Sequence, residues 1–266
     1  MSKLSILISC MHQDDERIVS ESNVQTDVVV INQCNNDHCY TSDFNNIQND
    51  TCKLVWINTS QRGLSKSRNM AIRNATSELC LIADDDEWFE DDAHINITQA
   101  FQEYPKADII TFLVEGSHSF NKPYAQHATE VGYIKAMQTS SVQIAFRLNR
   151  VVEKAIAFDE LMGSGSGHGG GEEIKFLFDS LHKGLKIQHV PVKIASLKKG
   201  SDSQWFKGYT KDFFIQRGWS TRRYLGTFMA VAYAWYYSVR KRHEYGHEMS
   251  MIKAVWYIHK GIFLNL

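Results

Sequence analysis

The sequence lacks several features that would place it in a simple class. It has three prolines in 266 residues and no run of about 18 apolar residues, so neither a Pro-rich linker nor a membrane span is expected. Its five cysteines form no Cys-x-x-Cys pair, which favours free thiols in a reducing compartment over structural zinc. Basic and acidic residues nearly balance, 29 against 30, whereas nucleic-acid-binding proteins have a basic surplus.

The first residues also lack the pattern of a secretory signal. A short β-like run and then charged residues follow Met1, with no small-residue cleavage site. We therefore expect a cytoplasmic globular protein that does not bind nucleic acid. The length suits one large α/β domain with an appendage.

What the sequence does contain is an alternation of short apolar runs and helical segments. Strands are expected at residues 5–10, 27–32, 54–58, 79–83, 107–114, 140–147 and 185–194. Helices are expected at residues 14–23, 65–75, 91–104 and 172–183, with Ser65 capping the second of them. This alternation predicts an α/β fold with a mostly parallel, Rossmann-like sheet flanked by helices.

The last sixty residues differ from the rest in composition. Residues 222–242 read as one long aromatic helix ending in Arg240-Lys241-Arg242, and residues 251–266 repeat the mixture of aromatic and basic side chains. Such a composition suits a helix lying in a membrane interface, and a helical pair packed on the main domain is an equal alternative. The expected domains are residues 1–204, divided near residue 115, and a helical extension at 205–266.

An acidic run follows the expected strand at 79–83. The carboxyl ends of parallel strands are where open α/β sheets bind ligands, and Asp84-Asp85-Asp86 stands at such an end. Crowded carboxylates repel one another unless a cation neutralises them. Asp84 and Asp86 alternate and point the same way, so they are candidate ligands for Mn²⁺ or Mg²⁺. The alternative is a solvated acidic turn.

Two further segments are candidates for binding and catalysis. Gly63 precedes a helix carrying Lys66 and Arg68, which could receive a diphosphate or simply be a capped surface helix. Residues 163–171 hold six glycines and must form an irregular loop, which ends at Glu172-Glu173. A carboxylate at a helix start stays charged, which suits a general base. Alternatively, the two glutamates only complement the helix dipole.

Order and spacing of these segments resemble a known family. The runs GLSKSRNMAIRNATSELCLIADDDEWF (63–89) and GGGEEIKF (169–176) are similar to the signatures of family-2 glycosyltransferases with the GT-A fold, of the bacterial surface-polysaccharide type. The resemblance covers roughly residues 4–200. It makes residues 1–115 the nucleotide-sugar half and residues 116–204 the acceptor half.

The resemblance implies an inverting, metal-dependent transfer. The donor would be a nucleoside-diphosphate sugar, with UDP-sugar favoured, and the acceptor a hydroxyl of a glycan or lipid-linked saccharide, reached by peripheral contact with the inner membrane face. The implied donor-binding residues are Ser9, Met11, Gln33, Arg68, Asp84, Asp85 and Lys199, with Asp84 and Asp86 as metal ligands. The implied catalytic residues are Glu173 as base and Glu172 beside it, with His168, Gly170 and Gly171 contacting the acceptor.

Two departures from the family pattern and two alternative functions complete the prediction. Asn32-Gln33 stands where the family often carries aspartates that contact the base, and Glu173 stands where it has an aspartate. A nucleotidyltransferase is the first alternative, but residues 9–13 lack the glycine-rich, basic loop that such enzymes have. A non-catalytic nucleotide-sugar or glycan-binding module is the second.

Overall fold

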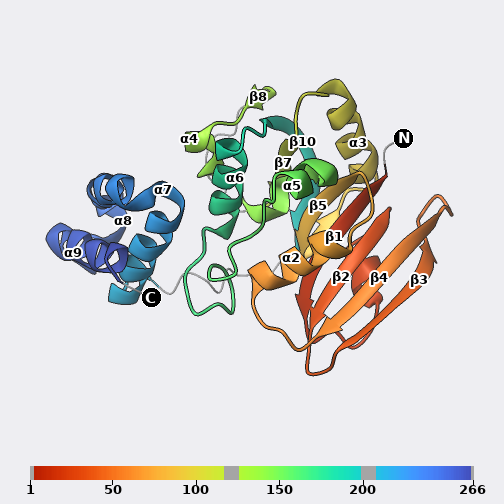
Figure 1. The fold of residues 1–266 in the computed structure, drawn as a ribbon, viewed down its shortest axis with the longest axis horizontal. Coiled ribbons are helices and arrows are strands. Elements are labelled where there is room, and N and C mark those ends of the chain that lie inside the picture. The colour runs from red at the N-terminus through yellow and green to blue at the C-terminus, as the bar shows by residue number, and fades with distance from the viewer. Residues whose placement is uncertain (1–2, 117–125, 199–207, 265–266) are drawn as a thin grey trace.

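The computed structural model describes residues 3–116, 126–198 and 208–264 (Figure 1). Its strands are β1 (Leu4–Met11), β2 (Asp27–Gln33), β3 (His38–Asn45), β4 (Thr51–Thr59), β5 (Leu79–Asp84), β6 (Glu87–Phe89), β7 (Ile109–Glu115), β8 (Thr129–Glu130), β9 (Ile144–Arg147) and β10 (Ile187–Leu197). Its helices are α1 (Arg17–Glu21), α2 (Leu64–Asn74), α3 (Ala93–Glu103), α4 (Tyr133–Ala136), α5 (Leu148–Glu153), α6 (Glu172–His182), α7 (Lys211–Arg240), α8 (Arg242–Tyr245) and α9 (Met251–Ile262), and a 3₁₀ turn spans Ser141–Gln143.

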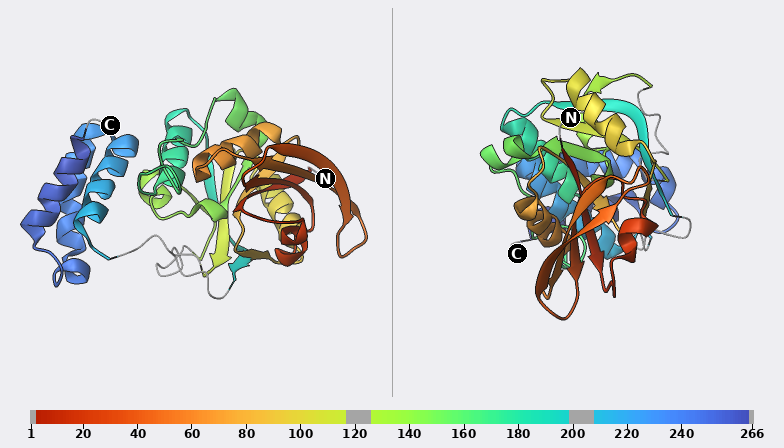
Figure 2. Two further views of the ribbon diagram at one scale, coloured as in Figure 1. Left: turned by 90° about the horizontal axis from the view of Figure 1, so that it is seen from below. Right: turned by 90° about the vertical axis from the view of Figure 1, so that its right-hand side faces the viewer.

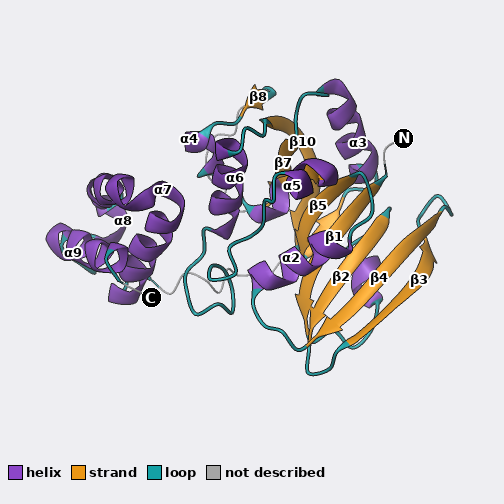
Figure 3. Cartoon of the chain, viewed as in Figure 1, coloured by secondary structure: helices purple, strands orange, loops and turns teal. Residues whose placement is uncertain are grey.

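One mixed sheet forms the centre of the molecule, with helices on its faces (Figure 3). The strand order is β3-β4-β2-β1-β5-β9-β7-β10-β6, and β8 pairs with β10. The block β4-β2-β1-β5 is parallel throughout, whereas β3, β6, β8 and β9 run antiparallel to their neighbours. The α/β fold is therefore confirmed, and the parallel pairs of its mixed sheet are the N-terminal block and the pair β7-β10.

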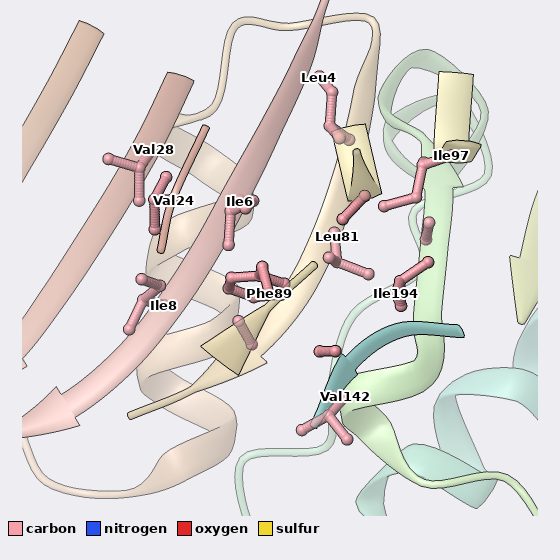
Figure 4. Packing of buried hydrophobic residues seen from close by; sticks show 14 of the residues in the cluster. Leu4, Ile6, Ile8, Val24, Val28, Leu81, Phe89, Ile97, Val142 and Ile194 are labelled. Carbon is pink, nitrogen blue, oxygen red and sulfur yellow. The ribbon is translucent and has the colours of Figure 1, made fainter. Parts of the chain in front are cut away.

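Both faces of the parallel block are buried, which explains its continuous apolar runs. In β1, Leu4, Ile6 and Ile8 point into one core cluster while Leu7 points into the other. Figure 4 shows the first cluster, where Leu81 of β5 meets these side chains. Because successive side chains of a strand face opposite sides, both sets of side chains in such a strand are mostly apolar.

Several local predictions were wrong. The first helix is shorter than residues 14–23, because only Arg17–Glu21 is helical. Ser65 is not a cap: α2 starts after Gly63, and the Ser65 hydroxyl instead donates to the carbonyl of Met162 at 2.8 Å. The strands β3 and β6 were missed.

The C-terminal helices form a small bundle beside the main domain (Figure 2). The predicted helix at 222–242 was wrong at its start, because α7 begins at Lys211. The prediction also missed a break at Gly226, whose φ of 74° and ψ of 165° are not helical. Helices α7 and α9 cross closely: a Cβ on Gly218 would lie 2.0 Å from the carbonyl oxygen of Ile258. No helix within the described ranges is long and apolar enough to cross a membrane.

Candidate active site

Strand register places the predicted donor residues at one edge of the sheet. In the parallel block, Ser9 of β1 pairs with Asp84 of β5, and Met11 pairs with Gln33 of β2. The strand order reverses direction at β1, since β2 lies on one side of it and β5 on the other. Such a switch point, at the carboxyl ends of the strands, is where α/β sheets bind nucleotides.

Helix α2 buries a polar face against this edge. Ser67 is hydrogen-bonded to Ser9 at 2.9 Å, and the Asn69 amide both donates to and accepts from the backbone of Phe158. Two N–H groups at the start of the helix are already used, because Gly63 donates to the Gln33 side chain and Leu64 to a loop carbonyl, both at 2.8 Å. Residues 63–69 therefore connect β1, β2, the glycine-rich loop and the segment around Phe158 by hydrogen bonds.

Arg68 is the centre of this arrangement. Its side chain has no exposed surface, yet its guanidinium donates to Asp84 at 2.8 Å, to Glu172 at 3.1 Å and to the Ser141 hydroxyl at 2.8 Å. Burial disfavours a charged arginine, and the two carboxylates outweigh it, so the pKa of Arg68 is raised. The two halves of the site are thus joined through one buried cation.

The chain turns after Asp84-Asp85-Asp86, so that the Glu87 side chain contacts the backbone of Asp84. Glu87, fully buried in β6, accepts the backbone N–H of Asp84 at 3.0 Å. Burial, followed by the charge of Asp84, raises the pKa of Glu87 well above its ordinary value. Removal from water, then the charges of Asp84 and Asp86, raise the pKa of Asp85. The carboxylates of this run therefore repel one another, as expected of a site that receives a cation.

The glycine-rich loop wraps the start of α6. A Cβ on Gly163, whose φ is +88°, would lie 3.1 Å from the Glu172 carboxyl carbon and 3.2 Å from the Ser65 hydroxyl. Only glycine fits this approach. Burial, followed by the neighbouring charge of Glu172, raises the pKa of Glu173 to about 8. A carboxylate with such a raised pKa is a strong proton acceptor once it is ionised.

Helix α7 holds the same loop from the other side. The His168 ring stacks on Trp219 with centroids 4.0 Å apart, and Gly169 donates its N–H to Gln216 at 3.1 Å. Arg223 forms an ion pair with Asp159, just before the loop. The C-terminal bundle thus contributes to the position of the loop that leads to Glu173.

The other residues predicted to bind the donor or the acceptor differ in their exposure and their hydrogen-bond partners. Met11 is 47% exposed at the end of β1, and Gln33 is buried with its side-chain oxygen bound to Gly63. Lys199 lies outside the described residues, while Lys198 beside it donates its backbone N–H to the carbonyl of Asp86. The roles given to these residues, and to His168, Gly170 and Gly171, stay predictions.

Sequence reasoning missed two residues that shape the site. Glu87 is the fourth acidic residue in a row, and the aromatic pair Trp88-Phe89 directly after it was the available signal. Ser141 carried no signal, because its contact with Arg68 joins residues 73 positions apart.

The sequence pattern of the family described as Glycosyl transferase family 2 matches residues 16–159, more than half of the chain. The chain therefore belongs to this family. Among curated protein sequences none matches significantly.

Solved structures share the fold. TarS 1–349 from S. aureus superposes with a TM-score of 0.56 at 16% identity, over 83% of this chain and 65% of that one. The same protein in complex with UDP-GlcNAc gives 0.56 at 17%, over 83% and 66%. The mannosyltransferase PcManGT from Pyrobaculum calidifontis, in complex with GDP-Man and Mn²⁺, gives 0.53 at 12%, over 98% and 74%.

Proposed function

We propose that the protein is an inverting glycosyltransferase that moves a sugar from a nucleoside-diphosphate sugar to a hydroxyl of a glycan or lipid-linked saccharide. One observation carries the proposal: Arg68 links Asp84, at the switch point of the sheet, to Glu172, beside the candidate base Glu173. A donor at the strand ends and an acceptor at the glycine-rich loop would then meet between these two carboxylate groups.

In this mechanism Glu173 acts as the base. Its carboxylate accepts the proton of the acceptor hydroxyl while that oxygen attacks the anomeric carbon. The bond between this carbon and the diphosphate oxygen breaks, and its electron pair leaves with the nucleoside diphosphate. Because attack comes from the face opposite the leaving group, the configuration inverts. The raised pKa of Glu173 suits this proton transfer.

The acidic run fits a divalent cation of the Mg²⁺ or Mn²⁺ type. Within the described residues no cluster of three or more His, Cys, Asp or Glu side chains could hold a metal alone. Such ions are commonly held by one or two carboxylates together with substrate phosphates, and Asp86 with Asp84 supplies two. When bound, the cation would neutralise charge on the departing diphosphate. The Arg68 guanidinium donates to both oxygens of Asp84, at 2.8 and 3.2 Å.

The nucleobase is assigned from the family resemblance. UDP-sugar is favoured by the family resemblance, and the similar structures contain UDP-GlcNAc in one case and GDP-Man in another. Asn32 is fully engaged, since its amide donates to the Gln13 carbonyl and to Asn58 and accepts the Gln13 N–H. Base recognition therefore falls to neighbouring groups such as Gln33.

The bundle supplies a surface for contact with an anionic membrane. Phe228 is 85% exposed on α7, and Ile252 and Trp256 are 76% and 57% exposed on α9. Trp235 on α7 packs 6.4 Å from the His259 ring of α9, which brings the two apolar stripes side by side. Residues 208–264 carry nine Lys or Arg and three Asp or Glu. Exposed aromatic side chains with basic neighbours suit the headgroup region of a membrane, here proposed as its cytoplasmic face.

Glu173→Gln tests the catalytic proposal. We expect transfer, measured as nucleotide release from UDP-sugars with Mn²⁺, to fall by about a hundredfold to ten-thousandfold. Thermal unfolding with UDP or GDP, with Mn²⁺ or EDTA, should show unchanged nucleotide binding. Glu103→Gln, at the end of α3, is the matched control. Robust turnover by Glu173→Gln would remove this residue from the base role.

Vesicle sedimentation tests the membrane contact. The full chain should sediment with phosphatidylglycerol vesicles and not with phosphatidylcholine vesicles, because the bundle is basic. Phe228→Ser with Trp256→Ser should weaken binding by about tenfold or more, since each aromatic side chain contributes about 1.5–3 kcal/mol when buried. Ile134→Ser, at an exposed site on α4, is the control. Equal sedimentation of the double variant would leave the bundle as a packing element only.

A further inference from the structure

Helix α7 folds back on itself around a second arginine. Tyr237 follows Arg217 by 20 residues, which on a continuous helix would separate them by about 30 Å. The break at Gly226 instead brings the Tyr237 ring centroid to 4.9 Å from the Arg217 guanidinium carbon. Phe213 lies 5.3 Å away on the other side, and Tyr233 packs beside Tyr237 with centroids 5.8 Å apart. We call Phe213, Arg217, Tyr224, Tyr233 and Tyr237 the Arg217 cluster.

Among the described residues, Arg217 has no carboxylate counterion. No carboxylate of the described residues lies within 4.0 Å of its side-chain nitrogens, although the side chain is largely enclosed. Burial alone would lower the pKa of Arg217, and the surrounding tyrosines outweigh it. Burial raises the pKa values of Tyr224, Tyr233 and Tyr237, so their hydroxyls stay neutral. Contact with aromatic faces offsets part of the desolvation, but it leaves the positive charge in place.

The Arg217 cluster adjoins the acceptor side of the active site. A Cβ on Gly171, the residue before α6, would lie 3.4 Å from the Tyr224 ring. Tyr224 also packs edge-on against Phe178 of α6, with centroids 5.7 Å apart. One turn after Arg217, the buried Ser220 hydroxyl has no hydrogen-bond partner among the described residues, and it lies 3.6 Å from the Cβ position of Gly169. One buried hydroxyl without a partner among the described residues, that of Ser220, thus faces the glycine-rich loop.

We infer that the Arg217 cluster binds a phosphate ester carried by the acceptor. A guanidinium presents several N–H donors in one plane, which matches the oxygens of a phosphate group. Tyrosine hydroxyls at the same place add further donors, and the aromatic walls would pack on the adjoining carbons. The acceptor role of this phosphate rests on the glycosyltransferase function proposed above, whereas the anion site itself does not.

Binding of inorganic phosphate and methyl phosphate to the full chain tests the inference. Saturating UDP fills the donor site during the calorimetric titration, so that phosphate bound there is not counted. Arg217→Gln should weaken phosphate binding by about tenfold to a hundredfold, the range for hydrogen bonds to a charged group. Tyr233→Phe should weaken it less, and Arg240→Gln, at the exposed end of α7, should leave it unchanged.

The outcomes separate this inference from the proposed function. Weaker phosphate binding by Arg217→Gln with unchanged UDP binding supports the site, and acetate that binds far more weakly than methyl phosphate supports a phosphate over a carboxylate. Equal phosphate affinity of Arg217→Gln and wild type would overturn it, as would phosphate binding that UDP abolishes. If Arg217→Gln fails to fold, Arg217→Lys and Tyr233→Phe decide: wild-type phosphate affinity in both overturns the site. None of these results depends on Glu173.

Discussion

Two arginines in this molecule illustrate different ways of keeping a cation out of water. Arg68 has no exposed surface and contacts two carboxylates and a hydroxyl, each from a different segment. Arg217 is enclosed by aromatic rings and by neutral hydroxyls, and none of the described carboxylates forms an ion pair with it. The first is neutralised by the protein itself, whereas the second retains a charge that a ligand can neutralise.

This difference in partners indicates which of the two arginines has a structural role. A buried cation with internal partners holds its surroundings together, because removal of one partner leaves uncompensated charge. A cation without such partners contributes less to folding and more to recognition. By this criterion Arg68 positions the proposed donor and acceptor residues relative to each other, and Arg217 is available for the phosphate binding proposed above.

The largest expected effect compares the two arginines directly. Arg68→Met should lower the free energy of unfolding by about 3–5 kcal/mol, since Asp84 and Glu172 would lose their shared cation. Arg217→Met should lower it by no more than about 2 kcal/mol, the scale of aromatic contacts to an enclosed cation. Arg73→Met, exposed on the same helix as Arg68, is the control. Urea unfolding measures all three, and equal losses at Arg68 and Arg217 would erase the distinction.

An intermediate effect is expected where α7 crosses α9. Gly218→Ala places a Cβ against the carbonyl of Ile258, so it should destabilise the protein by about 1–3 kcal/mol through overpacking. Because α7 also holds the glycine-rich loop, the apparent KM for acceptor should rise while UDP binding is unchanged. Gly132→Ala, with open space around its Cβ position, is the control. Unchanged stability of Gly218→Ala would mean that the two helices separate easily.

The last prediction concerns the pH dependence that Glu173 gives to stability and to transfer. Its pKa is about 8 in the folded protein and about 4.3 in an unfolded chain. The folded state therefore keeps a proton that the unfolded state has lost, and this stabilisation is complete below about pH 4.3 and declines as the pH rises to about 8. Transfer, which needs the ionised base, should increase over the same range. Unfolding curves of wild type and Glu173→Gln that stay parallel with pH would contradict the assignment.

Apolar runs predicted the parallel strands because each strand is buried on both faces. The acidic run and α6 were also placed correctly, since a strand end and a helix start are local features of sequence. The edge strand His38–Asn45 was missed because its residues are polar and mostly exposed, so that only Tyr40 and Phe44 mark its half-buried face as apolar.

Long-range features were not predictable from one sequence. The ion pair between Arg68 and Glu172 joins residues 104 positions apart, and nothing local to either residue indicates the other. The break at Gly226 was missed for a related reason. A single glycine in a helical pattern is usually tolerated, and only the packing of Tyr233 and Tyr237 against Arg217 shows that the chain turns back there.

The place of β10 in the sheet has a consequence for biosynthesis. This strand lies between β7 and β6, although the chain reaches Ile187 long after Phe89 has been made. At about 5–20 residues per second, roughly 5–20 s of translation separate β6 from its partner. During that interval the nascent chain presents an unpaired strand edge, which can pair with other chains. Yield of active protein should therefore depend on the speed of translation through residues 90–197.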